Sequence, residues 1–174
     1  MATQSERRTE TRRSVVAAAI QLFDESGDTS ASLEDIATLA GVAKSTVVYH
    51  FESRIGLLQV VARRIFAEAR QTEVQPAGDV STPDKVAWIA ALLTSQTDAR
   101  AQVLHAIDDE LTSARSLGDA DPSPWLTEAL ADLGLREPEI AAMALLQISR
   151  RIARGLIDPS EIHDIAKRVT DAFG

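Results

Sequence analysis

The chain has 174 residues, which is enough for one large domain or for a small module joined to a mid-sized one. Hydrophobic residues make up 45% and aromatic residues 4% of the chain, and the abundance of Ala and Leu favours helices over sheets. The absence of cysteine excludes disulfides and thiolate-bound metal, and no apolar segment is long enough for a signal sequence or a membrane span. We therefore expect a cytoplasmic protein without a membrane partner.

The net charge of −8 is unevenly distributed along the chain. Residues 1–64 hold eight Lys and Arg against eight Asp and Glu, whereas residues 65–174 hold ten against eighteen. An acidic protein binds nucleic acid poorly as a whole, but here the excess acid lies entirely in the C-terminal part. The distribution is thus compatible with an N-terminal nucleic-acid-binding domain.

Apolar residues at helical spacing predict two helices at the start of the chain. The first runs over about 7–26 and ends at Gly27, a residue suited to the left-handed conformation that closes many helices. The second, shorter helix follows Ser32, whose hydroxyl can cap the helix while Asp35 caps in return.

A turn and two more helices come next. Gly41 lies where a tight turn needs a residue that tolerates positive φ. A third, short helix is expected over about 44–50, and Ser53 is a good cap for a fourth helix that reaches about residue 73.

The remaining residues predict five more helices, so the expected fold class is all-α with about nine helices. We expect an N-terminal three-helix domain over 1–52, a connecting helix over 53–75 and a C-terminal domain over 76–174. The C-terminal helices are expected from Thr82, over 99–117, from Ser123, over 138–156 and from Asp158 nearly to the end, with connections at "VQPAGDVST" and "GDADPSP".

The third helix carries two different faces. Val47 and Phe51 are four residues apart and can both point into a core. An outer face is then shared by Lys44, Ser45, Val48 and Tyr49. Side chains of these kinds can read a DNA major groove. Lys44 supplies a cation for phosphate or guanine, and Ser45 supplies a short hydroxyl, as does the neighbouring Thr46. Val48 offers an apolar group to a thymine methyl, and Tyr49 carries a phenol. Two short helices joined by a glycine turn therefore predict a helix-turn-helix domain.

Three segments within about residues 13–60 form a pattern: "VVAAAIQLFDESG", "SLEDIATLAGVAKSTVVYHF" and "ESRIGLL". Together they resemble the N-terminal domain of the TetR family of transcriptional regulators. The family pattern differs at three positions: Val48 replaces the usual Tyr, Ser45 a frequent Gly and Ile55 a frequent Glu. The positions that fit it are Ala19, Phe23, Gly27, Ile36, Ala37, Ala40, Gly41, Val42, Thr46, Phe51, Ser53 and Leu58.

The resemblance implies a set of DNA-contacting residues. It puts Lys44, Ser45, Thr46 and Tyr49 on or beside the recognition helix, and Ser32 beside the phosphate backbone. Arg54 stands where the family usually has a phosphate-binding lysine. Tyr49 has an alternative interpretation, in which it packs on the first helix, and the arginines of the N-terminal arm can be solvated charges instead of DNA ligands. The full set is Arg12, Ser32, Lys44, Ser45, Thr46, Val48, Tyr49, His50 and Arg54.

A small-molecule effector pocket is expected in the C-terminal domain. His105 lies in an apolar stretch and is followed by acids, and it can serve as a polar contact beside Asp108 with an aromatic wall. The alternative is a core histidine with its hydrogen bonds satisfied, next to a solvated acidic face. The candidate residues are Trp88, Leu92, His105, Asp108 and Trp125.

The last two helices carry apolar stripes that can either close the core or form a homodimer interface. The resemblance implies the second use, because these helices commonly pair with those of a second subunit in the TetR family. The interface set is Leu145, Ile148, Ile152, Leu156, Ile162, Ile165, Val169 and Phe173.

These patterns predict a DNA-binding homodimer, usually a repressor, that a small-molecule effector releases from a palindromic operator. A helical ligand-sensing or protein-interaction dimer without specific DNA affinity is the alternative. We expect no enzyme, no cofactor and no metal site, because the three histidines are scattered and no nucleophile–base set or phosphate-cradling glycine loop is present in the sequence.

Overall fold

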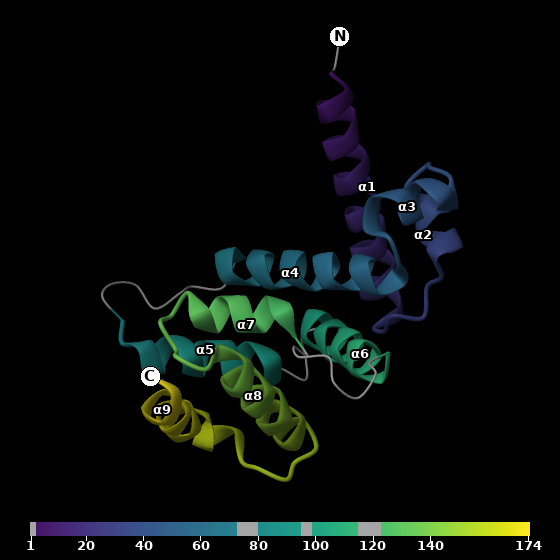
Figure 1. The fold of residues 1–174 in the computed structure, drawn as a ribbon. Coiled ribbons are helices and arrows are strands. Elements are labelled where there is room, and N and C mark those ends of the chain that lie inside the picture. The colour runs from purple at the N-terminus through teal and green to yellow at the C-terminus, as the bar shows by residue number, and fades with distance from the viewer. Residues whose placement is uncertain (1–2, 73–79, 95–98, 115–122) are drawn as a thin grey trace.

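The protein is a bundle of helices in two layers (Figure 1). The structure is a computed structural model that describes residues 3–72, 80–94, 99–114 and 123–174, and within these ranges it contains nine α-helices and no strand. The all-helical fold is thus confirmed. The helices are α1 Gln4–Ser26, α2 Leu33–Leu39, α3 Lys44–Phe51, α4 Arg54–Thr72, α5 Thr82–Thr94, α6 Ala99–Ser113, α7 Pro124–Ala131, α8 Pro138–Ala153 and α9 Ile162–Phe173, with a 3-10 turn Pro159–Glu161 before α9.

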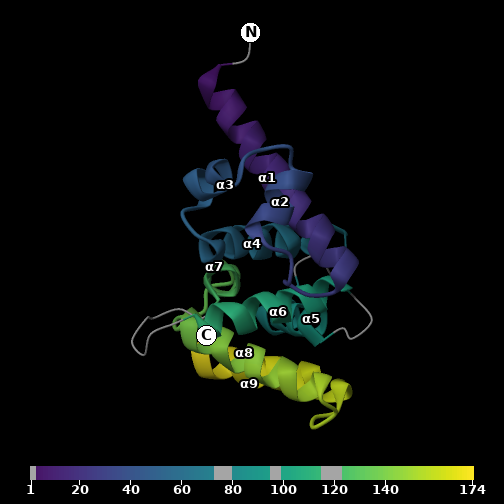
Figure 2. The same ribbon diagram turned by 90° about the vertical axis from the view of Figure 1, so that its right-hand side faces the viewer.

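Helix α4 lies between the two layers. In Figures 1 and 2, α1, α2 and α3 stand on one side of α4, and α5 to α9 lie on the other. The N-terminal turns of α1 extend beyond α2 and α3 (Figure 1). None of the described helices is long and apolar enough to cross a bilayer.

One hydrophobic core runs through both layers. Val15 and Phe23 of α1 pack with Ile36 of α2 and Val47 of α3 in the N-terminal layer. On α4, buried side chains at helical spacing join this cluster to α6 and α7. The α4 residues that do so are Leu57, Leu58, Val61, Ala62, Ile65 and Phe66.

Most predicted helix ends are found in the structure. Ser32 and Asp35 form the expected reciprocal capping box at the start of α2, and Gly27 closes α1 with a φ of 72°. Helix α1 begins earlier than expected because Thr3 and Glu6 form a second capping box. Most of the predicted connections lie outside the described residues.

The end of α8 differs from the sequence expectation. The helix ends at Ala153 and not near residue 156, because Gly155 has a φ of 69° and takes the left-handed conformation that follows many helices. Asp158 accepts a hydrogen bond from the amide of Ser160 and so caps the 3-10 turn, and α9 begins only after that turn.

Gly56 allows α4 to start close to the end of α3. A Cβ atom at Gly56 would lie 2.1 Å from the carbonyl oxygen of Phe51, the last residue of α3. The amide of Gly56 also donates to Oγ of Ser53 at 3.1 Å, which confirms Ser53 as a capping residue for α4. Gly56 therefore sets how closely α3 can approach α4.

We expect Gly56→Ala to lower the free energy of unfolding by about 1–3 kcal/mol, since the added methyl group must push backbone away. Gly41→Asn is the matched control. Gly41 has a φ of 69° with open space around it, and Asn is the side chain that best tolerates this conformation after Gly. Urea denaturation measures both changes, and a larger loss for Gly41→Asn than for Gly56→Ala would contradict the explanation.

Candidate nucleic-acid interface

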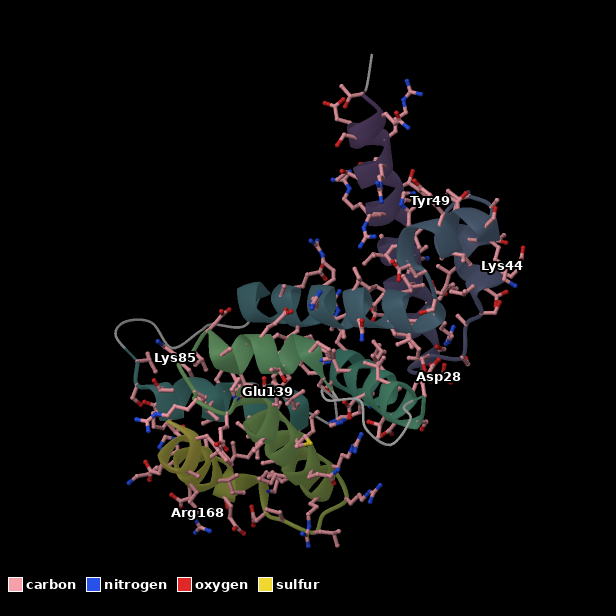
Figure 3. The ribbon with its side chains drawn as sticks, in the orientation of Figure 1. Asp28, Lys44, Tyr49, Lys85, Glu139 and Arg168 are labelled. Atoms are coloured by element: carbon pink, nitrogen blue, oxygen red, sulfur yellow. The ribbon has the colours of Figure 1, made fainter. Side chains whose placement is uncertain are left out.

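Helix α3 presents the two faces expected from its sequence. Val47 and Phe51 are buried against α1, α2 and α4, and they hold the helix in place. On the other face, Val48 is 42% and Tyr49 is 69% exposed, and Lys44 and Ser45 are exposed as well. The exposed face lies at the outer edge of the N-terminal layer, where Figure 3 shows Lys44 and Tyr49.

The turn between α2 and α3 is held by backbone hydrogen bonds. The amide of Val42 donates to the Ala37 carbonyl at 3.0 Å, and the amide of Gly41 donates to the Thr38 carbonyl at 3.1 Å. Gly41 takes the positive φ that this turn requires. Ala37 is buried, and its small side chain permits the close crossing of the two helices. The arrangement is a helix-turn-helix with α3 as its second helix.

Arg12 connects α1 to the C-terminal end of α3. Its Nη1 donates to the carbonyl oxygen of His50 at 2.5 Å, and its guanidinium lies 4.6 Å from the centre of the Phe51 ring. The last carbonyls of a helix lack helical partners and carry partial negative charge, so a cation is favourable there. The half-buried Arg12 thus has a structural contact in this helix-turn-helix.

The aromatic end of α3 lies close to two arginines of α1. The guanidinium of Arg8 lies 5.7 Å from the centre of the Tyr49 ring, so Tyr49 does contact α1 while most of its surface stays exposed. Burial, followed by the charges of Arg8 and Arg12, lowers the pKa of His50 below its usual value. His50 is therefore neutral at pH 7, and the positive charge near Tyr49 comes from α1.

Lys44 and Ser32 lie on the same side of the domain with their polar groups exposed. Nζ of Lys44 is 3.8 Å from Oε2 of Glu34, and both side chains are exposed, so this weak surface pair leaves the ammonium accessible. Oγ of Ser32 accepts from the amide of Asp35 at 3.2 Å and donates to its carboxylate at 2.7 Å. The hydroxyl of Ser32, followed by its amide, which donates to the same carboxylate at 2.8 Å, lowers the pKa of Asp35.

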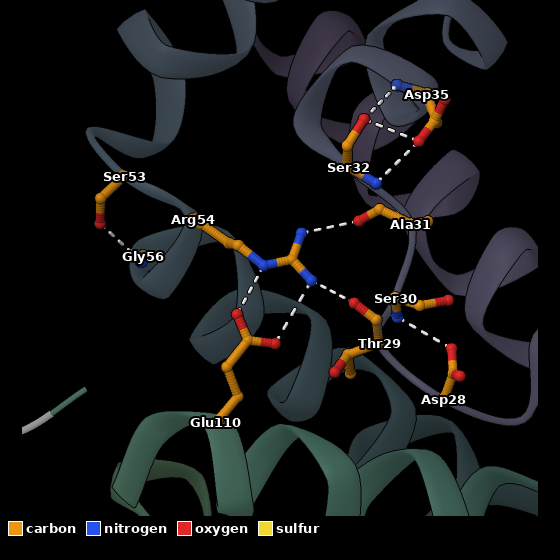
Figure 4. Close-up of polar contacts among 10 residues, drawn as sticks. All are labelled: Asp28, Thr29, Ser30, Ala31, Ser32, Asp35, Ser53, Arg54, Gly56 and Glu110. Atoms are coloured by element: carbon orange, nitrogen blue, oxygen red, sulfur yellow. Dashed lines mark hydrogen bonds and ion pairs between the residues drawn. The ribbon is translucent and has the colours of Figure 1, made fainter. Parts of the chain in front are cut away.

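The guanidinium of Arg54, another predicted DNA ligand, points toward Glu110 and the loop between α1 and α2 (Figure 4). Its Nε donates to Oε1 of Glu110 at 2.5 Å, and its Nη1 donates to the Ala31 carbonyl at 2.7 Å. Nη2 donates to the Thr29 carbonyl. The residue expected to meet phosphate thus has intramolecular partners.

The predicted effector residues lie in the interior of the C-terminal layer. Asp108 is 1% exposed and accepts hydrogen bonds from Ser123 and from Arg150, the latter at 2.5 Å. Nε2 of His105 is 2.6 Å from the Leu93 carbonyl, which is the hydrogen bond that the core-histidine interpretation requires. Leu92 is buried, Trp88 is half-buried, and the ring of the buried Trp125 packs 5.1 Å from that of Phe66.

Burial raises the pKa of Asp108, and this effect exceeds the opposing influence of Ser123 and Arg150. A carboxyl group with a raised pKa makes the folded state bind more protons than the unfolded state between the two pKa values, so stability falls as the pH rises through that window. We expect the stability of the wild type relative to Asp108→Asn to be greatest below about pH 4 and to decrease above it.

Urea denaturation of both proteins across the acidic to neutral range measures this difference. Asp109→Asn is the control, because Asp109 pairs with the same Arg150 at 2.5 Å but is 69% exposed. A relative stability of the wild type that rises with pH would show instead that the ion pair lowers the pKa of Asp108.

The predicted dimer residues divide between the core and the surface. Leu145, Ile152 and Val169 are buried within the chain, where α9 packs on α5 and α8. Ile148, Ile162, Ile165 and Phe173 are half-buried, and Leu156 is 65% exposed. The opposite face of α8 carries Ile140 and Met143, which are 45% and 44% exposed and were not predicted. Their spacing of three residues, which puts both on one side of a helix, is the sequence signal that could have indicated them.

Comparison with known proteins agrees with this geometry. Residues 15–61 match the sequence profile of the bacterial regulatory proteins of the tetR family. Residues 15–61 are therefore a TetR-family N-terminal domain. The chain is 32% identical over 102 residues to the HTH-type transcriptional repressor BepR of Brucella suis biovar 1 (strain 1330), a match that covers 56% of this chain and 49% of BepR. It is 38% identical over 52 residues to the HTH-type transcriptional regulator SrpR of Pseudomonas putida, covering 30% of this chain and 24% of SrpR.

Solved structures of TetR-family proteins share the fold over nearly the whole chain. A TetR transcriptional regulator from Rhodococcus sp. RHA1 superposes with a TM-score of 0.64 at 18% identity, covering 96% of this chain and 97% of that one. NalD of Pseudomonas aeruginosa, a secondary repressor of a multidrug efflux pump, has a TM-score of 0.50 at 21% identity, covering 95% and 98%. The chain spans about half the length of BepR and less of SrpR. These TetR-family relatives are regulators, in agreement with the expectation that this chain is not an enzyme.

Proposed function

We propose that this protein is a sequence-specific DNA-binding transcriptional regulator, and that it acts as a repressor in the cytoplasm. The observation that carries the proposal is the exposed face of α3, with Lys44, Ser45, Val48 and Tyr49 at the edge of a helix-turn-helix. The names of BepR and NalD, both repressors, support the direction of regulation.

In this proposal α3 enters the major groove. Lys44 contacts phosphate or guanine, Ser45 and Thr46 donate short hydrogen bonds, and the Tyr49 hydroxyl reaches phosphate. Val48 replaces an aromatic residue of the family pattern and offers its methyl groups to thymine. Beside the groove, Ser32 at the start of α2 contacts the phosphate backbone.

Charge favours one orientation on DNA. The excess of acid over base lies in residues 65–174, whereas residues 1–64 carry equal numbers of acids and bases, so phosphate repels the C-terminal layer more strongly than the N-terminal one. Arg12 lies close enough to the α3 face to add positive potential there while it is bonded to the end of α3. His50, which is neutral, can act as a hydrogen-bonding group.

A palindromic operator requires two copies of α3. We propose that a homodimer forms through the outer face of α8, which carries Ile140 and Met143, together with Leu156, which follows the helix. All three side chains are exposed and leave apolar surface uncovered. Half-sites separated by one turn of DNA, roughly 34 Å, would then match the two recognition helices.

We further propose that a small molecule binds in the C-terminal layer and weakens DNA binding by favouring a different separation of the two α3 helices. The residues proposed to contact it are Trp88, Leu92, His105, Asp108 and Trp125. Their interior position supports this, because a ligand there must displace packing between α5, α6 and α7.

We expect the double variant Lys44→Ala with Tyr49→Ala to bind the DNA upstream of the protein's own gene about 10- to 150-fold more weakly than the wild type, because each side chain contributes to groove or phosphate contact. Wild-type affinity should also fall steeply with salt, as counterions are released on binding. Fluorescence anisotropy with labelled duplexes measures both effects.

Lys85→Ala is the matched control, because it removes the same charge at the opposite end of the molecule (Figure 3). It should leave the affinity unchanged. If wild type and double variant bind the upstream DNA and a scrambled duplex equally, the protein is a ligand-sensing dimer without specific DNA affinity, and the proposed function is wrong.

We expect Ile140→Glu with Met143→Glu to shift the protein from dimer to monomer, because burying two carboxylates in an apolar interface is unfavourable. Sedimentation velocity measures the change. Ala67→Glu, on the exposed side of α4, is the control and should remain dimeric. A double variant that sediments as the wild type does would exclude this face of α8 as the interface.

A further inference from the structure

The contacts of Arg54 connect three segments that are distant in the sequence (Figure 4). Arg54 is the first residue of α4, Glu110 lies in α6, and the carbonyls of Thr29 and Ala31 belong to the loop between α1 and α2. Nη2 also donates to the second carboxylate oxygen of Glu110 at 3.3 Å. All three guanidinium nitrogens are thus bonded inside the protein, and the side chains of Arg54 and Glu110 are only 27% and 29% exposed.

The carbonyls that Arg54 holds lie immediately before α2. Ala31 precedes Ser32, the N-cap of α2, and loop carbonyls in this position have no helical partner. Before these two carbonyls in the chain, Oδ1 of Asp28 accepts a hydrogen bond from the amide of Ser30 at 2.8 Å. After them, the capping box of Ser32 and Asp35 fixes the first turn of α2. Arg54 is therefore the connection between this rigid loop and helices α4 and α6.

We propose that Arg54 is a positioning residue, fixed by Glu110, that sets the placement of α2 and hence of α3 on the protein, and that it does not contact phosphate. This inference rests on the proposed DNA-binding function. A guanidinium that left for phosphate would have to break its bonds to a carboxylate and two carbonyls, and would leave Glu110 unpaired in a half-buried site. The role implied by the family position would then fall to other cations, Lys44 among them.

The two roles predict opposite effects of removing Glu110. If Arg54 were a phosphate ligand, Glu110 would compete with DNA, so its loss would strengthen binding and increase the salt dependence. If Arg54 positions the loop, the loss of Glu110 frees the guanidinium and the α1–α2 loop, and DNA binding weakens although a negative charge has been removed. General electrostatics alone would favour tighter binding.

The experiment compares Glu110→Ala and Arg54→Lys with the control Glu128→Ala. Glu128 of α7 pairs with Arg63 of the same helix α4 at 2.5 Å, on an exposed surface, so its removal changes the net charge equally without touching the loop. Arg54→Lys keeps the charge that a phosphate contact needs but cannot bridge the carboxylate and both carbonyls. Affinity for the upstream DNA is measured over a range of salt concentrations.

We expect Glu110→Ala and Arg54→Lys to bind about tenfold more weakly with the salt slope of the wild type, whereas Glu128→Ala retains or slightly exceeds wild-type affinity. Tighter binding by Glu110→Ala, or wild-type affinity in Arg54→Lys, would overturn the proposal. Circular dichroism and thermal unfolding identify any variant that fails to fold.

A second measurement needs no DNA and therefore separates this inference from the proposed function. Amide hydrogen exchange over residues 29–36 should become faster in Glu110→Ala and Arg54→Lys, with α8 and α9 unchanged, and should stay at the wild-type rate in Glu128→Ala. If the wild type shows no specific DNA binding, faster exchange in the loop still supports the positioning role. Unchanged exchange in both variants would refute it.

Discussion

The burial of α4 on two sides is the interaction on which the rest of the structure depends. Leu58 and Ile65 are fully enclosed, and Phe66 packs on Trp125 of α7. Each fully buried aliphatic or aromatic side chain of this kind stabilises the fold by about 1.5–3 kcal/mol relative to exposure. The same helix contacts α1 and α3 on one side and α6 and α7 on the other, so α4 is the packed connection between the C-terminal layer and the helix-turn-helix.

The packing on α4 also explains the composition of α3. Thr46, Val47 and Val48 are three successive β-branched residues, which are poor helix formers, and a helix of eight residues is too short to be stable alone. Val47 and Phe51 anchor it in the core, and Arg12 donates to the carbonyl of His50 near its end. Tertiary contacts thus supply the stability, which leaves the outer face of α3 free to carry side chains suited to a DNA groove.

The bases of the N-terminal part differ in the partners that the fold gives them. The guanidinium groups of Arg12 and Arg54 donate hydrogen bonds to backbone carbonyls, whereas the side chain of Lys44 is mostly exposed to solvent. The sequence signals for these three residues were similar, since each is a base in or beside the helix-turn-helix. They differ in burial and in the partners within reach, and these depend on residues such as Glu110 that are far away in the chain.

The start of α2, the Gly41 turn and the two faces of α3 could be determined from the sequence, because capping and helical periodicity act between residues at most four positions apart. The partners of Arg54 could not be determined from the sequence, and neither could the question of which apolar side chains of α8 are covered by other helices. Periodicity shows that Leu145 and Ile152 lie on one apolar face of α8. Only the packing of α5 and α9 decides that this face is buried and that Ile140 and Met143 stay exposed. Tertiary structure decides such questions because they depend on which distant surfaces meet, and no local signal carries that information.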